Sequence, residues 1–403
     1  MSSKERIMAV IEGKDVDYTP LYAWCFGFHP PRELRWVRNG KERAYWYTMR
    51  LEHLHTLPYD WDIFDDLERV KRWLGLGIDD VIDISFPWSM HPDVKIRYRE
   101  EKNVQCCFYE TPEGVITQKV RKTEETILEG WVIQPEKPKL FEDFNLPRSE
   151  KFPVSSSEDL RAIKYLLYPP SKEEIDSYKE KIKLIREFTS RVPVAVQGWS
   201  AFGLDAVVWL MGVQNAVVSA LTEPDFFQEL VDTIYRFDRM RTEMMIEIGG
   251  VDIIVQRGWY GSTDFWSPQL IKKFVIPNLK GFTHLVHQAG LKAGYVMTTG
   301  VMSLIETIIE SGVDLLYFAD PQQENFDLVD LKSKINNRIC VAGGLSSSLT
   351  LNRLDEKSVK KKTEEVLKKM GRKKFILSPV DSLFPDTPYQ NVQAMIEAWR
   401  GYR

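Results

Sequence analysis

Residues that could do chemistry are concentrated between positions 251 and 300. The apolar residues Ile253 to Val255 are followed abruptly by polar and aromatic residues, namely Gln256, Arg257, Gly258, Trp259 and Tyr260. Such groups are costly to bury without partners, so we expect them to line a site. Arg257 could clamp a carboxylate or phosphate with its planar guanidinium, and Tyr260 could donate a hydrogen bond or a proton. A salt bridge to a neighbouring loop is the alternative role for Arg257.

Other candidates stand where further apolar runs end. Asp83 could stabilise a cationic group or act as a base, and His29 could be a general acid or a metal ligand. The catalytic hypotheses are therefore Asp83, Arg257, Tyr260 and His29. The substrate-binding hypotheses, with no residue assigned to a metal, are Arg32, Trp88, Gln197, Trp199, Gln256, Trp259, Thr298, Asp320 and Asp381. Local capping is the alternative for the aspartates, because aspartate often caps the turn that follows it.

These positions require a fold that brings the ends of separate strands together. Short, mostly continuous apolar runs alternate with helical patterns, as expected for parallel strands covered on both faces. We predict eight strands, at residues 18–28, 78–88, 193–199, 251–255, 291–297, 313–319, 338–342 and 374–377. No Gly-x-Gly-x-x-Gly follows the first strand, which disfavours a doubly wound open sheet. The sequence therefore predicts an α/β protein, a (β/α)8 TIM barrel whose active site lies at the carboxyl ends of its strands.

Residues 90–153 break this alternation. Three β-rich segments, VKIRY, VQCCFY and VITQKV, surround a turn signal at residues 111–114. They predict a β-hairpin or small meander inserted into a single barrel domain that spans residues 1–403. Helices are predicted at 3–11, 45–57, 157–167, 171–189, 206–221, 224–248, 267–289, 303–311, 327–335, 356–370 and 389–399.

Length and composition narrow the class of protein. The 403 residues, 43% of them hydrophobic, suffice for a large buried core. No apolar run approaches the roughly 20 residues of a membrane helix, and the N-terminus lacks a secretory signal pattern. We therefore expect a cytoplasmic protein that binds no membrane. A net charge of −4 gives no electrostatic footprint for nucleic acid. The four cysteines have no C-x-x-C spacing, so neither a disulfide framework nor a thiolate zinc site is indicated.

Several segments occur in a recognisable order along the chain. They are KERIMAVIEGKDVDYTP, YETPEGVITQKV, FPVSSSEDLRAIKYL, GGVDIIVQ, SPQLIKKFVIPNLKGF, ESGVDLL, VAGGLSS and ILSPVDSLFPDTPYQNVQAMIEAW. In this order the sequence resembles the uroporphyrinogen decarboxylase superfamily, which also contains cobamide-dependent methyltransferases. The resemblance covers most of the chain. It implies a (β/α) barrel, in agreement with the strand pattern, together with a small-molecule substrate and a homodimer.

The chain departs from this superfamily at positions that carry chemistry. The decarboxylases resemble one another in an Arg-Gln-Ala-Gly-Arg-Tyr loop, whereas this chain reads AWCFGFHPPRELR, where Arg32 and Arg35 could take over part of the role. They also carry a histidine after the last strand, where this chain has Val380-Asp381-Ser382. Zinc-bearing methyltransferases use a His-x-Cys pair after the fifth strand, and the corresponding residues here are Met297-Thr298-Thr299. Because zinc prefers imidazole and thiolate, that zinc site is not expected.

Three functions stay open from the sequence. The favoured one is a methyltransferase-like enzyme in cobamide-linked one-carbon metabolism, which implies a corrinoid on a partner protein or zinc held by non-standard ligands. The second is decarboxylation of a porphyrinogen-like or other polycarboxylate, which requires a cation-rich mouth with Arg257 and Asp83 facing each other. The third is a non-catalytic binding paralogue, whose mouth is plugged by aromatic residues, namely Trp24, Trp88, Trp199 and Trp259.

Overall fold

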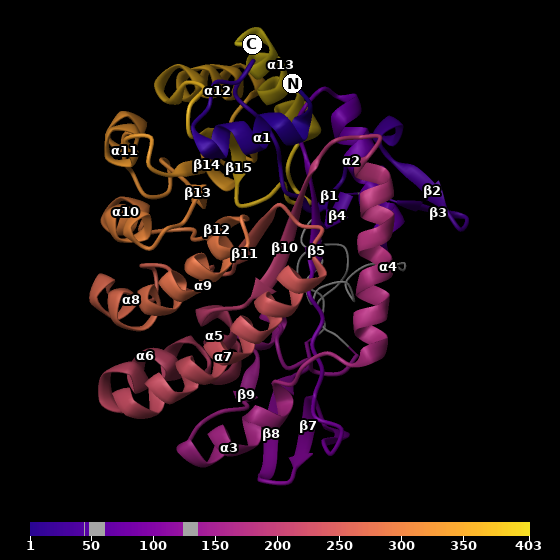
Figure 1. Cartoon of the computed structure of the whole chain (residues 1–403), viewed down its shortest axis with the longest axis vertical. Coiled ribbons are helices and arrows are strands. Elements are labelled where there is room, and N and C mark those ends of the chain that lie inside the picture. The colour runs from indigo at the N-terminus through magenta and orange to yellow at the C-terminus, as the bar shows by residue number, and fades with distance from the viewer. Residues whose placement is uncertain (44, 48–60, 124–135) are drawn as a thin grey trace.

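The computed structural model describes residues 1–43, 45–47, 61–123 and 136–403. Its centre is a curled parallel sheet of seven strands in the order β15-β14-β13-β12-β11-β10-β5 (Figure 1). These strands are β5 Val81–Ser85, β10 Ala195–Ala201, β11 Ile253–Gln256, β12 Lys292–Val296, β13 Leu315–Ala319, β14 Cys340–Ser346 and β15 Phe375–Val380. Almost all of their residues are buried. The continuous apolar runs therefore formed strands that are covered on both faces, as predicted.

The chain from residue 20 to residue 26 fills the gap between β15 and β5. Leu21 pairs in parallel with Leu377 of β15. On its other side the Leu21 carbonyl accepts the N–H of Asp79, just before β5, at 2.8 Å. This segment therefore takes the eighth strand position, and the predicted (β/α)8 barrel fold is confirmed.

Helices cover the outside of the barrel and close one of its ends. They are α1 Ser3–Glu12, α2 Ile63–Gly75, α3 Ser157–Leu166, α4 Lys172–Thr189, α5 Leu204–Met211, α6 Val213–Thr222, α7 Pro224–Ile248, α8 Pro268–Phe274, α9 Ile276–Gln288, α10 Val301–Glu310, α11 Leu328–Ile335, α12 Glu356–Met370 and α13 Tyr389–Gly401. α1 starts with a capping box between Ser2 and Glu5 and ends at Gly13, whose φ of 77° favours glycine. Its apolar side chains pack with Val81 and Ala195, the first residues of β5 and β10. α1 thus plugs the amino-terminal end of the barrel and leaves the opposite end as the mouth (Figure 1).

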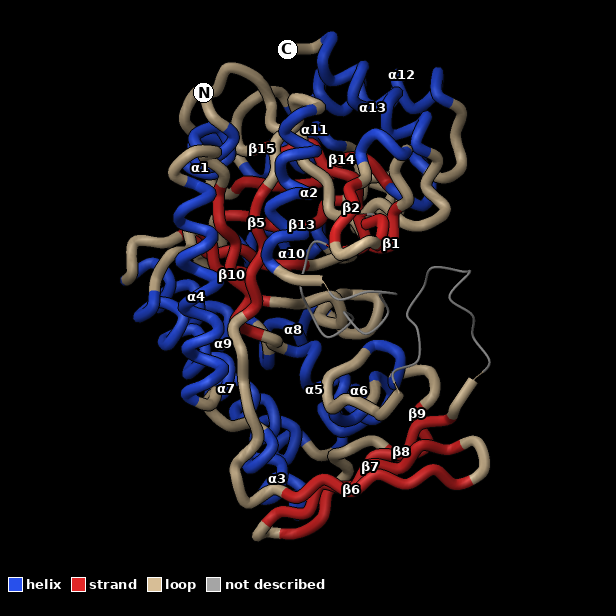
Figure 2. Tube along the Cα trace, turned by 90° about the vertical axis from the view of Figure 1, so that its right-hand side faces the viewer, coloured by secondary structure: helices blue, strands red, loops and turns tan. Residues whose placement is uncertain are grey.

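A separate antiparallel sheet is inserted between β5 and α3. It consists of β6 Lys95–Glu101, β7 Val104–Thr111, β8 Gly114–Arg121 and β9 Ser149–Lys151, which confirms the predicted meander within residues 90–153. Figure 2 shows it at the end of the molecule farthest from the chain termini. Buried Gln105 and Gln118 donate to the carbonyls of Glu136 and Lys139 at 2.9 and 3.3 Å. These bonds fasten residues 136–145, here called the strap, to the inserted sheet.

The region between the first strand position and α2 differs from the prediction. β1 Phe26–Phe28 pairs with β4 Tyr45–Tyr47, so the helix predicted at 45–57 is wrong at its start, and residues 48–57 lie outside the described residues. After the short 3-10 helix η1 Arg32–Leu34, the chain forms a hairpin of β2 Trp36–Arg38 and β3 Lys41–Arg43 that the sequence analysis did not predict. Its turn is Asn39-Gly40, with φ values of 50° and 72°. Asn-Gly is the usual sequence for such a two-residue turn, a signal that the prediction overlooked.

Two predicted helices are each divided in two. The 206–221 prediction becomes α5 and α6, which break at Gly212, where φ is 78°. The 267–289 prediction becomes α8 and α9, because Pro277 lacks the N–H that would continue the helix. Among the described residues no single helix is long and apolar enough to cross a membrane, although α5 and α6, bent by 104°, pass that test as a pair.

Candidate active site at the barrel mouth

A polar layer of four side chains lies inside the barrel. Alternate residues of a strand face the same side, so Asp83 and Gln197, which are paired in register, both point inward with Val81 and Ala195. The Tyr22 hydroxyl donates to the Tyr317 hydroxyl at 2.6 Å, and Tyr317 donates to Gln197 Oε1 at 2.7 Å. Gln197 Nε2 in turn donates to Asp83 Oδ1 at 2.9 Å. The polar layer, defined as Tyr22, Asp83, Gln197 and Tyr317, is thus one continuous chain of hydrogen bonds.

Asp83 is the ionisable end of the polar layer. Its Oδ1 also accepts the Trp199 Nε1–H at 2.8 Å, whereas its Oδ2 has no hydrogen-bond partner among the described residues. The side chain is only 1% exposed. This burial raises the pKa of Asp83 to about 8, although Trp199 and Arg69 act in the opposite direction. Asp83 is therefore mainly a neutral acid at pH 7.

Three indole rings close the barrel above the polar layer. The ring centres of Trp24 and Trp199 are 5.5 Å apart, and the Trp259 ring lies 5.9 Å from Trp24 and 6.0 Å from Trp199. Trp24 and Trp199 are buried, and Trp259 is partly exposed. The structure thus brings together three of the four tryptophans that we named as a possible plug, without Trp88.

Arg257 lies between two tryptophan rings at the mouth. The carbon of its guanidinium is 4.6 Å from the centre of the Trp209 ring and 4.8 Å from that of Trp259. Its Nε donates to Asp205 Oδ2 at 3.2 Å. Arg257 is therefore held by two ring faces and by the salt bridge that we named as its alternative role.

The polar groups of the neighbouring aromatic residues also end on carboxylates. Trp259 Nε1 donates to Asp381 Oδ1 at 3.0 Å, and Trp209 Nε1 donates to Asp143 Oδ1 at 2.7 Å. The Tyr260 hydroxyl donates to the same Asp143 oxygen at 2.7 Å. We call this set of side chains the mouth cluster, consisting of Asp143, Asp205, Trp209, Arg257, Trp259, Tyr260 and Asp381.

Among the described residues, the mouth cluster has more carboxyl groups than cationic groups. The cluster contains three carboxyl groups, those of Asp143, Asp205 and Asp381, and one guanidinium group, that of Arg257. Burial raises the pKa of Asp205 and of Asp381 to about 6, while the positive charge of Arg257 acts to lower both. Both carboxyls are therefore mainly ionised at pH 7, and the cluster favours a neutral or cationic ligand over a polyanion.

Several other predicted site residues have different surroundings. Gln256 points out of the barrel toward α5 and α7, because it alternates along β11 with Val255, which faces inward. Asp320 accepts the backbone N–H groups of the turn that follows it, at 2.9 and 3.0 Å, which is the capping role named as its alternative. Thr298 is partly exposed just beyond β12, and His29 is exposed just beyond β1.

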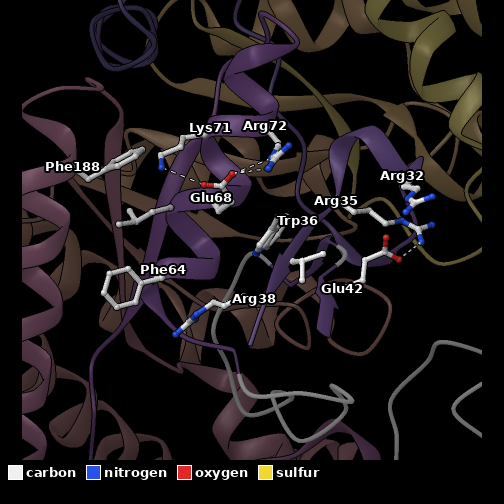
Figure 3. Close-up of a pocket in the computed structure, with 12 residues that line it drawn as sticks. Arg32, Arg35, Trp36, Arg38, Glu42, Phe64, Glu68, Lys71, Arg72 and Phe188 are labelled. Atoms are coloured by element: carbon white, nitrogen blue, oxygen red, sulfur yellow. Dashed lines mark hydrogen bonds and ion pairs between the residues drawn. The ribbon is translucent and has the colours of Figure 1, made fainter. Parts of the chain in front are cut away.

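Arg32 lies on the side of the barrel, in an open pocket of about 630 Å³ between the β2–β3 hairpin and α2 (Figure 3). Ion pairs line this pocket, Arg35 with Glu42 and both Lys71 and Arg72 with Glu68. No member of the mouth cluster is among the described residues that line it. Arg32 therefore serves a different face of the protein from Arg257.

A cavity of about 590 Å³ lies between the inserted sheet and the strap. Trp88 lines it, packed on Phe141 of the strap with ring centres 5.2 Å apart, and Lys137 and Lys139 also contribute. The strap continues from Phe141 to Asp143 of the mouth cluster. The cavity thus adjoins the mouth, and its aromatic and aliphatic side chains, which include Trp88, Tyr98, Tyr109 and Phe141, suit the apolar part of a ligand.

The structure reveals functional candidates that the sequence analysis missed. Tyr22 and Tyr317 could have been found from strand alternation, which places both hydroxyls inside the barrel. Asp205 could have been suspected because it starts the helix that follows β10, at the mouth. Asp143 lies in the strap, far along the chain from its partner Tyr260, and no local pattern marks it.

The residues at the end of β12 do not fit the zinc site of the methyltransferase branch. Met297, Thr298 and Thr299 stand there, and zinc prefers imidazole and thiolate ligands. Cys340 is the first residue of β14, at the opposite end of the strand from the mouth, and burial raises the pKa of its thiol. In the part of the chain that the structure describes, no three His, Cys, Asp or Glu side chains are grouped to hold a metal ion.

Comparison with known proteins gives one family match and several distant relatives. The family model described as uroporphyrinogen decarboxylase (URO-D) matches residues 140–402. Uroporphyrinogen decarboxylases from two strains of Prochlorococcus marinus, AS9601 and MIT 9312, are 23% identical over 184 residues and 22% identical over 179 residues. Each alignment covers 44% of this chain and 49% of the relative, so the chain spans about half the length of the curated relatives it matches.

A solved structure resembles the whole chain. A methyltransferase from Methanosarcina mazei has a TM-score of 0.59 to this chain, with 18% sequence identity, over 100% of this chain and 99% of the other. At this identity the likeness shows the fold alone. It agrees with the overall fold described above.

Proposed function

Because the chain belongs to the uroporphyrinogen decarboxylase family, we propose that it is a methyltransferase-like enzyme of this superfamily. It moves a methyl group between a small neutral or cationic molecule and a corrinoid carried by a partner protein. The observation that carries this proposal is the surplus of carboxyl groups over cationic groups in the part of the mouth cluster that the structure describes. The whole-length likeness in fold to a methyltransferase from Methanosarcina mazei is consistent with it.

The charges of the mouth argue against a polycarboxylate substrate. Two like charges 4 Å apart repel each other by about 4 kcal/mol at an effective dielectric constant of 20. A substrate carboxylate placed beside the ionised Asp381 would meet such repulsion, and Arg257 already pairs with Asp205. The charged residues that act on Asp83 are Arg69 and Asp80, so the facing pair of Asp83 and Arg257 that decarboxylation requires is not supported.

The residues of this chain have distinct parts in the proposed reaction. The cavity between the inserted sheet and the strap binds the apolar part of the substrate. The partly exposed Trp259 and Tyr260 flank the place where the methyl group enters the mouth. Arg257, fixed between two rings, orients the substrate from the wall of the mouth. The corrinoid supplies the methyl-carrying chemistry and comes with the partner protein.

Methyl transfer to free cob(I)alamin tests this proposal. Purified protein is incubated without oxygen with cob(I)alamin and, one class at a time, methylated amines, methyl ethers and methyl thioethers, and methylcobalamin is followed by absorbance. We expect at least one class to react, and Arg257→Ala to slow the reaction by about 100-fold, as for loss of one preorganised donor. Arg338→Ala, at an exposed arginine that pairs with Glu306, is the matched control and keeps the wild-type rate. Absence of methyl transfer with every class would sink the proposal.

A binding paralogue without catalysis is the second candidate. It is favoured by the packing of Trp24, Trp199 and Trp259, which fills the barrel interior next to the mouth. A catalytic barrel of this kind has to admit a substrate beside these rings. Saturable binding of a methylated compound, with no methyl transfer under any of the conditions above, would establish this second candidate in place of the first.

A further inference from the structure

The polar layer occupies a level of the barrel that apolar side chains normally fill. Below it are Val81 and Ala195, which meet α1, and above it are the indoles of Trp24 and Trp199. Branched apolar residues usually dominate the layers inside such barrels. A buried carboxyl with one oxygen lacking a partner costs free energy. Departures of this kind from a favourable core are expected at functional sites.

The hydrogen bonds of the polar layer all run in one direction. An indole N–H can only donate, so Asp83 Oδ1 has to accept from Trp199. The oxygen of the Gln197 amide accepts from Tyr317, so its NH₂ group has to face Asp83. Oδ1 therefore receives two N–H donors, which leaves no acceptable position for a proton on this oxygen.

We infer that Asp83 is held as a neutral carboxylic acid with its proton on Oδ2, and that Gln197, Tyr317 and Tyr22 are the positioning residues that fix it there. Oδ2 is the oxygen with no hydrogen-bond partner among the described residues. Its O–H is consequently available to an acceptor inside the barrel. Asp83 is then the proton donor of this site.

The charged groups packed around Asp83 are compatible with a neutral acid. Arg69 of α2 is the cation that acts on it, but the guanidinium of Arg69 binds Asp80 Oδ2 at 2.5 Å and the Val81 carbonyl at 3.0 Å. Asp80 itself acts to raise the pKa of Asp83. Burial holds the phenol pKa of Tyr22 and of Tyr317 well above the usual range, so both hydroxyls remain neutral donors.

The use of this proton rests on the proposed function. When a methyl group leaves an oxygen or nitrogen of the substrate, the bond between that atom and the methyl carbon breaks and its electron pair stays on the oxygen or nitrogen. That atom then needs a proton, and Asp83 Oδ2 is the donor that this chain would supply, relayed past the indoles of Trp24 and Trp199 that close the barrel above it. A corrinoid on the partner protein would supply the methyl-accepting chemistry. The protonation state of Asp83 does not depend on this reaction and can be measured without any substrate.

Infrared spectroscopy tests the inference directly. Protein labelled with ¹³C in its aspartate carboxyls is titrated in D₂O from pH 5.5 to 9.5, beside unlabelled protein. We expect a carboxylic-acid C=O band that shifts with the label, disappears with a midpoint near pH 8 and is missing in Asp83→Asn. Tyr317→Phe removes the hydroxyl that orients Gln197 and so weakens the hydrogen bond from Gln197 to Asp83, which favours the ionised carboxylate. We expect the midpoint of the Asp83 band in this variant to rise by roughly one pH unit.

Tyr295→Phe is the matched control, because Tyr295 is buried in the neighbouring strand β12 and lies outside the polar layer. It should leave the midpoint unchanged. The inference is overturned when the wild type shows no carboxylic-acid band of Asp83 at pH 6, or when Asp83→Asn retains this band. It is also overturned when Tyr317→Phe and Tyr295→Phe shift the midpoint of the band equally. Should Asp83→Asn fail to fold, the wild-type titration and the two tyrosine variants still decide. Failure of the methyl-transfer assay with this band present would reject the proposed function and leave the inference standing.

Discussion

Replacing Asp83 by asparagine should make the stability of the protein less dependent on pH. Asp83 has a pKa of about 8 in the folded protein, against about 4 in an unfolded chain. Between these two values the folded state holds a proton that the unfolded state has released. The contribution of Asp83 to the free energy of unfolding is therefore greatest below about pH 4 and is lost as the pH rises toward 8.

The size of this effect follows from proton linkage. One proton of difference changes the free energy of unfolding by about 1.4 kcal/mol per pH unit, or about 3 kcal/mol between pH 5 and pH 7. Asparagine does not titrate, and it has nearly the shape of the neutral acid. Its oxygen can accept from Gln197 and Trp199, and its NH₂ can replace the O–H. Relative to the wild type, we expect the variant to gain about 3 kcal/mol over this range.

Urea denaturation at pH 5, 6 and 7 measures this difference. The wild type, Asp83→Asn and the exposed control Asp386→Asn are compared at each pH. The difference in free energy of unfolding between the wild type and Asp83→Asn should change with pH. The difference between the wild type and Asp386→Asn should stay the same. A difference between wild type and Asp83→Asn that stays constant within about 0.5 kcal/mol over the range would refute the reasoning, given the slope expected from linkage.

Three further substitutions test the packing around the mouth and at the break between α5 and α6. Arg257→Ala leaves the buried Asp205 without its cation, so we expect about 3 to 5 kcal/mol of destabilisation in urea, and a loss under 1 kcal/mol would show that the pair is unimportant. Trp259→Phe keeps a ring but removes the N–H that donates to Asp381. We expect the free energy of unfolding to fall by about 1 kcal/mol and the pKa of Asp381, measured by ¹³C NMR, to rise. An unchanged pKa of Asp381 would contradict this hydrogen bond. Gly212→Ala forces φ of 78° on alanine and brings its Cβ within 2.5 Å of Phe152, so we expect a loss of about 1 to 3 kcal/mol, while Gly401→Ala, which meets open space, should be neutral. Equal effects of the two glycine substitutions would contradict this account.

The barrel could be predicted because its strands carry their own signal. Most are largely apolar runs followed by polar residues or glycine, which is the pattern expected for strands covered on both faces. The region after the first strand was less predictable. The aromatic residues of β4 suit either a helix or a strand, and they formed a strand by pairing with β1, which is distant in sequence.

The candidate site was only partly predictable for a related reason. Asp83, Gln197 and Trp199 lie near the ends of predicted strands, and parallel register then brings them together. The partners of Arg257 and Tyr260 could not be found in this way. Asp205 lies on a helix 52 residues before Arg257, and Asp143 lies in the strap, 117 residues before Tyr260. Such contacts depend on how the inserted sheet and helices pack on the barrel, which local patterns do not encode.

The most direct test of the central claim is to measure both family reactions on one wild-type preparation. Methyl transfer from the panel of methylated compounds to cob(I)alamin is followed by absorbance, and carbon dioxide release from uroporphyrinogen is followed in a parallel sample. The carboxylate-rich mouth cluster predicts methyl transfer without carbon dioxide release. Release of carbon dioxide without methyl transfer would contradict the account and identify the protein as a decarboxylase.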